Sequence, residues 1–170
     1  MVVSVGLIPI YNTAEVVVQN FLIRRAGPAD ADDLLAVRRD AIMGLSDKYG
    51  FAEADRWASA QHATRERAVE SIAVNHVWVA ESAAAVIGWV EVHGATVESL
   101  YVRSSAARGG VGSCLLEHGE RHIHDGGASS ANLEASPNAL QFYAQRGYLA
   151  TGEPTPNNAT PMTKSLVGAV

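Results

Sequence analysis

The most informative segment of the chain reads Ala107-Arg108-Gly109-Gly110-Val111-Gly112-Ser113, between the strand-like run Val97-Glu98-Ser99-Leu100-Tyr101-Val102 and a helical run that begins at Val111. Three of the four residues at 109–112 are glycine, which permits a tight turn that presents backbone N–H groups to a ligand. The following helix adds unpaired amides and the positive end of its dipole. Arg108 adds donors suited to phosphate oxygens. The segment therefore predicts a phosphate-binding loop.

Two common phosphate loops do not fit this segment. A Walker A loop needs a lysine after its last glycine, whereas Ser113 follows Gly112 directly. A dinucleotide fingerprint that starts at Gly110 needs a third small residue at position 115, where Leu115 stands. The loop is therefore not predicted to bind a nucleoside triphosphate or NAD.

The loop instead resembles the pyrophosphate-binding signature of the GNAT superfamily of acetyl-CoA-dependent N-acetyltransferases, Gln/Arg-x-x-Gly-x-Gly/Ala. Gly110 and Gly112 occupy its two small positions, and Ala107 stands where the family has Gln or Arg, next to the charged Arg108. The resemblance implies that the pyrophosphate of CoA binds along the whole segment, which comprises Ala107, Arg108, Gly109, Gly110, Val111, Gly112 and Ser113.

A second stretch, from Leu133 to Tyr148, resembles the family's second motif, in which a strand is followed by a short helix with Ala-x-x-Phe-Tyr and then Gly-Tyr or Gly-Phe. The matching residues are Ala139, Phe142, Tyr143, Gly147 and Tyr148. Ser136 stands where the family commonly has an asparagine, and Asn138 lies close by. Two motifs in the correct order are much less easily produced by chance than either one alone.

The resemblance also implies roles for particular residues. Tyr143 would protonate the departing thiolate of CoA, or it would simply pack as a buried tyrosine. The backbone of Leu100, Tyr101 and Val102 would pair with the pantetheine arm and polarise the acetyl carbonyl. Asn138 would contact the same arm or cap the helix.

An amine must lose a proton before it attacks a thioester, and a carboxylate or an ordered water chain can accept that proton. Glu98 is the main candidate base, because strand alternation places it on the same face as Leu100 and Val102, just ahead of the glycine loop. A solvated glutamate at a strand edge is the alternative. The lesser candidates are His93, Glu91 and Tyr101.

The amine acceptor has no recognisable motif. Tyr49, Trp57 and Trp89 are candidates to line its pocket, although ordinary core packing would explain each equally well. His118 and His122 lie four residues apart on the predicted helix, but they do not form a His-Glu-x-x-His motif. They are interpreted as part of a solvated polar face, and no metal is expected.

Length and composition predict one ordinary globular domain. The chain has 170 residues, 48% of them hydrophobic and 18% charged. A net charge of −5 argues against nucleic-acid binding. Cys114 is the only cysteine, so no internal disulfide can form, and a reducing, cytoplasmic location is expected. No apolar stretch is long enough to span a membrane. A homodimer is possible.

The order of the elements predicts an α/β (α+β) fold. Strands are expected at 21–25, 76–81, 86–93 and 97–102 and around Asn132 and Met162, with helices after Pro28, at 53–73, from Val111 to about His124 and in the second motif. A loop is expected at 154–161, between the last two strands. The implied GNAT fold is a mixed, mostly antiparallel central sheet flanked by helices. Residues 1–20 are expected to form an extension to a single domain at 21–170.

Two functions are consistent with this sequence. One is acetyl-CoA-dependent N-acetyl transfer to a primary amine of an unidentified small molecule or peptide, by direct attack of the amine on the thioester. The other is a GNAT-like module that binds CoA without turnover and acts as a sensor or an interaction domain. Glu98 and Tyr143 favour the enzyme, whereas Ala107 gives some support to the binding module.

Overall fold

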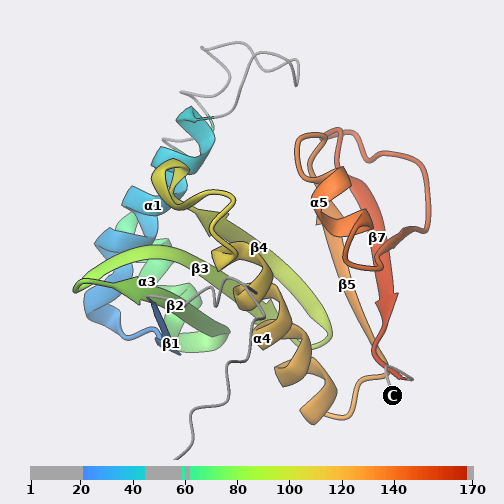
Figure 1. Cartoon of the computed structure of the whole chain (residues 1–170), viewed down its shortest axis with the longest axis horizontal. Coiled ribbons are helices and arrows are strands. Elements are labelled where there is room, and N and C mark those ends of the chain that lie inside the picture. Colours follow the sequence, from blue (N-terminus) through green and yellow to red (C-terminus); the bar gives the residue numbers. More distant parts are fainter. Residues whose placement is uncertain (1–20, 45–58, 60–61, 168–170) are drawn as a thin grey trace, which may run out of the picture.

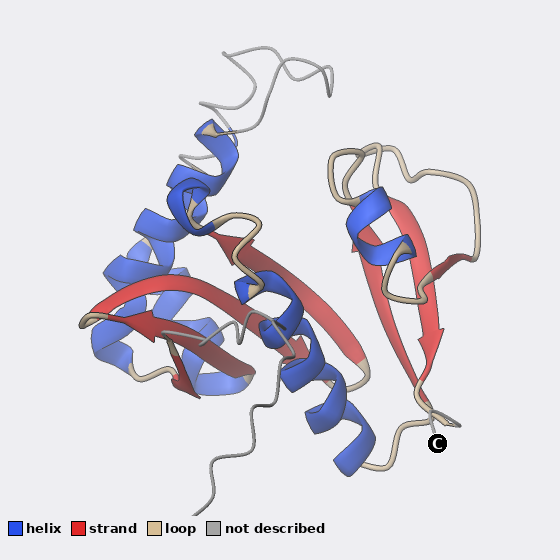
Figure 2. Cartoon of the chain, viewed as in Figure 1, coloured by secondary structure: helices blue, strands red, loops and turns tan. Residues whose placement is uncertain are grey.

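The computed structural model describes residues 21–44, 59 and 62–167 and contains one seven-stranded sheet in the order β1-β2-β3-β4-β5-β7-β6 (Figures 1 and 2). The strands are β1 (Leu22–Arg25), β2 (His76–Ser82), β3 (Ala85–His93), β4 (Thr96–Val102), β5 (Ser130–Ala135), β6 (Leu149–Ala150) and β7 (Thr160–Ser165). The helices are α1 (Ala31–Met43), α3 (Arg65–Val74), α4 (Val111–Asp125) and α5 (Leu140–Ala144), with short 3-10 turns at Pro28–Asp30 and Ser104–Ala106.

The sheet is mixed, because β4 and β5 run parallel while every other neighbouring pair is antiparallel. The predicted fold class is therefore confirmed. Within the predicted helical region at 53–73, the described helix α3 begins at Arg65, and residues 53–58 lie outside the described part. Strand β7 begins at Thr160, inside the predicted loop, and the two-residue strand β6 was not delimited by the sequence pattern.

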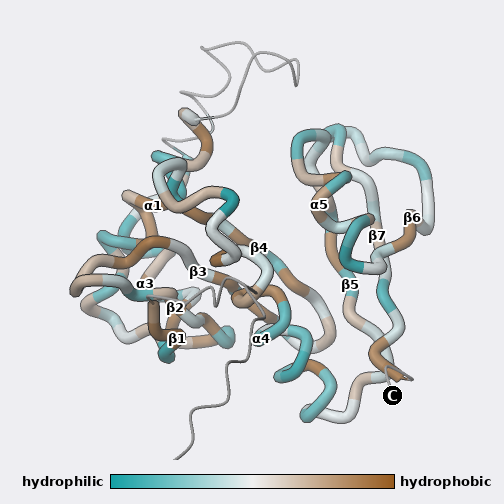
Figure 3. Tube along the Cα trace, viewed as in Figure 1, coloured by the Kyte–Doolittle hydropathy of each residue, from teal (hydrophilic) through white to brown (hydrophobic). Residues whose placement is uncertain are grey.

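Two hydrophobic clusters hold the helices against opposite faces of the sheet. On one face, α1 and α3 pack through residues such as Leu34, Val37 and Ile72, and Trp89 Nε1 donates a hydrogen bond to the Leu34 carbonyl at 3.0 Å. On the other face, the buried side of α4 joins the core of β3 through residues that include Leu115, Leu116 and Ile123. Figure 3 shows hydrophobic stretches along β3 and β4 and hydrophilic ones along α4.

Strands β4 and β5 separate along their length. Their only register pair in the described structure is Thr96 with Asn132, next to a hydrogen bond from the Asn132 N–H to the Ala95 carbonyl at 2.9 Å. Beyond that point the two ribbons diverge (Figure 1). The backbone of β4 from Val97 to Val102 therefore faces β5 without a paired strand.

One ion pair joins strand β7 to helix α4. Lys164 Nζ of β7 lies 2.6 Å from Glu120 Oε2 of α4, and the Glu120 side chain is only 9% exposed. A buried carboxylate needs such a partner, because an unpaired buried charge is costly. Among the described residues, none of the helices combines the length and apolar character needed to cross a membrane.

Candidate functional site

Two cavities meet at β4. The larger, of about 940 Å³, lies between β4, the glycine loop, the start of α4, and α5. The smaller, of about 570 Å³, lies between α1, α3, β3 and β4. Both are lined by Glu98, Ser99 and Tyr101. A molecule in one cavity can therefore reach a molecule in the other across a single strand.

The glycine loop turns as its sequence predicts. Arg108 has a φ of 65° and Gly110 a φ of 82°, and α4 begins at the next residue, Val111. The Cys114 N–H bonds the Gly110 carbonyl at 3.1 Å, which leaves the amides of Val111, Gly112 and Ser113 without intrahelical acceptors. A Cβ added at Gly110 would meet no atom within 4 Å. The loop thus opens free amides toward space, as an anion site requires.

The side chains around the loop differ in exposure and in contacts. Ala107, Arg108, Gly110, Gly112 and Ser113 line the larger cavity, while Gly109 and Val111 are absent from its lining. Ala107 and Arg108 are exposed, and Val111 is buried in the core. The loop therefore meets the cavity mainly through its backbone and the side chains of Arg108 and Ser113.

Arg146 was not singled out by the sequence analysis, and it also lines the larger cavity. Its Nη2 and Nε donate to Ser113 Oγ at 2.5 and 3.2 Å, and its Nη1 donates to the Phe142 carbonyl at 2.7 Å. Its guanidinium also lies 3.7 Å from the centroid of the Phe142 ring. These contacts place a fixed positive charge beside the start of α4, close to the loop in which Ala107 replaces a polar or charged residue.

Tyr143 lies on α5, is 8% exposed and lines the larger cavity. Its ring packs edge-on against Phe142 and Tyr148, with centroid separations of 5.1 and 5.6 Å. Burial is the main reason that the pKa of the Tyr143 hydroxyl is raised above its usual value, so the hydroxyl stays protonated at neutral pH. Tyr143 therefore packs as a buried tyrosine, which was the alternative interpretation, and it also lines the larger cavity.

Asn138 lines the same cavity, and its Oδ1 atom is buried without a hydrogen-bond partner. No side-chain hydrogen bond caps the start of α5 at Ala139, so the alternative role of Asn138 as a helix cap is wrong. An orphaned buried acceptor is costly unless a ligand satisfies it. The residues from Leu100 to Val102 line the cavity from β4, on the opposite side from Asn138.

Glu98 sits at an irregularity of the sheet. Glu91 pairs with Ser99 and Val92 pairs with Val97, so a β-bulge leaves Glu98 without a partner on β3. The regular alternation that placed Glu98 on one face with Leu100 and Val102 is therefore interrupted at this residue. The outcome is that Glu98 is exposed and lines both cavities, rather than only the one beside Leu100 and Val102.

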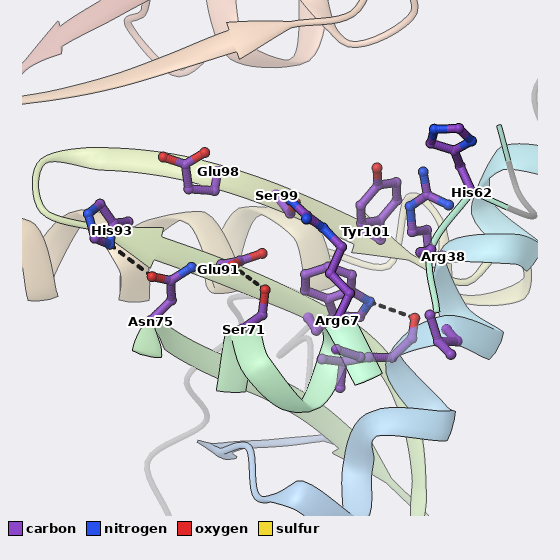
Figure 4. Close-up of a pocket in the computed structure, with 15 residues that line it drawn as sticks. Arg38, His62, Arg67, Ser71, Asn75, Glu91, His93, Glu98, Ser99 and Tyr101 are labelled. Carbon is purple, nitrogen blue, oxygen red and sulfur yellow. Dashed lines mark hydrogen bonds between the residues drawn. The ribbon is translucent and has the colours of Figure 1, made fainter. Parts of the chain in front are cut away.

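The smaller cavity contains Trp89, one of the three predicted acceptor residues, which is 6% exposed and also forms part of the core. Tyr49 and Trp57 lie outside the described residues. The lesser base candidates Glu91, His93 and Tyr101 all line this cavity (Figure 4). Both interpretations of Trp89, pocket wall and core packing, are thus compatible with its position.

The interpretation of α4 as carrying a solvated face at His118 and His122 is wrong. Both rings pack edge-on against the buried Trp78, at centroid distances of 5.0 and 4.8 Å, and His76 lies 4.1 Å from His122. Burial lowers the pKa of His118 and His76 below their usual values. In the described structure no group of three His, Cys, Asp or Glu side chains is arranged to hold a metal ion.

Comparison with known proteins finds a family model and solved structures that this chain resembles. Residues 45–166 match the model of a family described as acetyltransferase (GNAT) domain. A GCN5-related N-acetyltransferase from Rhodopseudomonas palustris is 26% identical with a TM-score of 0.80, and the match covers 86% of this chain and 96% of that one. No curated protein matches the chain.

Two further solved structures share the fold at lower identity. The PaiA N-acetyltransferase from Thermoplasma acidophilum in complex with coenzyme A is 18% identical, with a TM-score of 0.74 and coverage of 85% of this chain and 98% of that one. YncA from Salmonella typhimurium, with its cofactor acetyl-CoA, is 16% identical, with a TM-score of 0.68 and coverage of 89% and 96%.

Proposed function

This chain belongs to the GNAT family of acetyltransferases, and on that premise we propose that it transfers the acetyl group of acetyl-CoA to a primary amine of a small molecule or peptide. The main observation behind the proposal is that the two cavities meet at β4. The free backbone amides of the glycine loop lie beside the larger cavity, and titratable side chains line the smaller one. Two substrates can thus react directly, without a covalent intermediate on the chain.

The residues of the larger cavity fit a CoA thioester. The free amides at the start of α4 and the side chain of Arg108 suit the pyrophosphate. The unpaired edge of β4 from Leu100 to Val102 can pair with the amides of the pantetheine arm, and the orphaned Asn138 Oδ1 can accept a hydrogen bond from it. The coenzyme A and acetyl-CoA held by PaiA and YncA support this assignment.

Acetyl-CoA supplies the acetyl group as a thioester, and the residues of this chain position the amine and move its protons. Glu98, at the junction of the cavities, accepts the proton of the attacking amine directly or through water. A backbone N–H of β4 stabilises the negative charge that develops on the carbonyl oxygen. Tyr143, kept protonated by burial, donates a proton to the departing sulfur.

Arg146 is expected to strengthen the binding of the phosphates. Replacing Arg146 with glutamine should raise the Kd for CoA about 10-fold, since it removes a charge from beside the loop. The Kd for acetyl-pantetheine, which lacks the phosphates, should not change. Isothermal titration calorimetry measures both, with Arg121→Gln as a control because Arg121 is exposed on α4 and lies outside the cavity lining. Equal losses for both ligands would assign Arg146 a purely structural role.

A module that binds CoA without turnover is the second candidate, and Ala107 is the observation that favours it, because it removes a polar contact expected in the loop. Thermal denaturation with acetyl-CoA, combined with a thiol-release assay over a panel of primary amines, separates the two. The enzyme should be stabilised by acetyl-CoA and should release free CoA with at least one amine. Stabilisation without release from any amine supports the module, and the absence of both effects overturns both proposals.

Three expectations from the sequence stay predictions. These are a cytoplasmic location, a homodimer and the division of the chain into an extension at 1–20 and a domain from residue 21 onward. Residues 1–20 lie outside the described part of the structure. Size-exclusion chromatography with light scattering would measure the oligomeric state.

A further inference from the structure

The smaller cavity has charges of opposite sign at its two ends. Arg38 of α1 and Arg67 of α3 face one part of the cavity, on the side of His62, whereas Glu91 of β3 and Glu98 of β4 lie nearer to His93 (Figure 4). No ion pair joins either arginine to either glutamate in the described structure. The two sets of charges are thus kept apart across the cavity rather than neutralised by each other.

The basic end is open to an anion. Arg67, from α3, makes no side-chain hydrogen bond or ion pair with another described residue, and it extends across the cavity toward β4 (Figure 4). Arg38, from α1, is held by a hydrogen bond from its Nη1 to the Ser59 carbonyl at 2.8 Å, and its guanidinium lies 5.6 Å from the centroid of the Tyr101 ring. Arg38 is therefore held in place, whereas the side chain of Arg67 is available to bind a ligand.

The acidic end contains a carboxylate whose position is fixed. Glu91 is 7% exposed, and its Oε1 accepts hydrogen bonds from Ser71 Oγ at 2.8 Å and from Asn75 Nδ2 at 2.6 Å. Asn75 Oδ1 in turn lies 2.8 Å from His93 Nδ1. Both donors act on the same oxygen, and the second oxygen of Glu91 makes no hydrogen bond to a described residue. This end suits an ammonium group.

The place where the two cavities meet determines how a bound acceptor would be oriented. The reacting amine must lie beside Glu98, Ser99 and Tyr101, because among the described residues only these line both cavities. The rest of the acceptor then extends toward Arg38 and Arg67. A second ammonium group at that end would be repelled by the Arg67 guanidinium, whereas a carboxylate or phosphate would be bound by it.

We propose that the acceptor is zwitterionic: a primary amine that also carries an anionic group, which Arg67 and Arg38 bind while the amine faces Glu98. This inference rests on the proposed function and adds the substrate class to it. Simple diamines and uncharged alkylamines are then poor acceptors, because they offer no anionic group to Arg67.

Matched pairs of amines test the proposal. Lysine is compared with cadaverine, phenylalanine with phenethylamine and phosphoethanolamine with ethanolamine, so that each pair differs by one anionic group. We expect kcat/KM from thiol release to be about 10-fold or more higher for the preferred anionic members. Arg67→Gln should reduce that ratio to near one. Arg65→Gln is the control, since Arg65 is on the same helix, pairs with Asp32 at 3.2 Å and lies outside the cavity lining.

Ligand-observed NMR on the same pairs measures binding without turnover. If anionic amines bind to the wild type and not to Arg67→Gln while no amine releases thiol, the zwitterion site stands and the proposed enzyme fails. If uncharged amines or diamines react as well as their anionic partners, or if both arginine variants behave alike, the zwitterion proposal is overturned and the enzyme stands. Selective binding of the carboxylate pairs or of the phosphate pair identifies the anionic group.

Discussion

Replacement of Gly110 by glutamate is expected to abolish the binding of CoA. Gly110 adopts a φ of 82°, and the space in front of it is open, so a glutamate side chain would extend into the region that we assign to the pyrophosphate. There its negative charge would oppose the phosphates and occupy the free amides of α4. We expect the Kd for CoA to rise about 100-fold or more, measured by isothermal titration calorimetry.

The control is Gly110→Gln, which has almost the same shape and the same backbone conformation. Either substitution should destabilise the fold by about 1–2 kcal/mol, because only glycine adopts this φ without steric cost. Melting temperatures of the two variants should therefore agree while their affinities differ. A Gly110→Glu variant that binds CoA like the wild type would show that the loop does not contact the phosphates.

Replacement of Tyr143 by phenylalanine is expected to lower kcat about 100-fold or more, with little change in the affinity for acetyl-CoA. The hydroxyl is proposed to act only when the thiolate departs, so its loss should affect turnover and not binding. The phenylalanine ring retains the edge-on packing against Phe142 and Tyr148. Steady-state kinetics and calorimetry with CoA measure the two effects separately.

Tyr148→Phe is the matched control for this experiment. Tyr148 is 1% exposed, and it does not line the larger cavity. Its buried hydroxyl is also kept protonated, since burial raises the pKa of that group as well. The Tyr148 variant should therefore keep the wild-type kcat while it shares any general effect of removing a buried hydroxyl. Unchanged kcat in Tyr143→Phe would remove Tyr143 from the mechanism.

The parts of the fold that depend on local sequence could be predicted. The glycine loop, the helix that begins at Val111 and the hairpin between β2 and β3 each follow from the backbone preferences or the hydrophobic period of a short segment. The order of these elements, together with two motifs, was enough to indicate the family. Such features need no knowledge of which distant residues come into contact.

The features that sequence reasoning missed depend on contacts between distant segments. The bulge at Glu98 is a property of the register between β3 and β4, and alternation along one strand cannot reveal it. Arg146 acquires its position from Ser113, 33 residues away in the chain. The packing of His118 and His122 on Trp78 needs the helix to be placed on the sheet, so the histidines alone suggested a solvated face.

The separation of β4 from β5 also has a consequence for the stability of the fold. A sheet that opens at one end has two unpaired strand edges in its interior, and an unpaired edge is a template for pairing with another chain. A ligand bound in this opening therefore covers the unpaired edges, as a further strand would. At 100 times its Kd such a ligand adds about 2.7 kcal/mol to the free energy of unfolding. If that ligand is acetyl-CoA, as we propose, its concentration is expected to affect resistance to aggregation as well as the rate of catalysis.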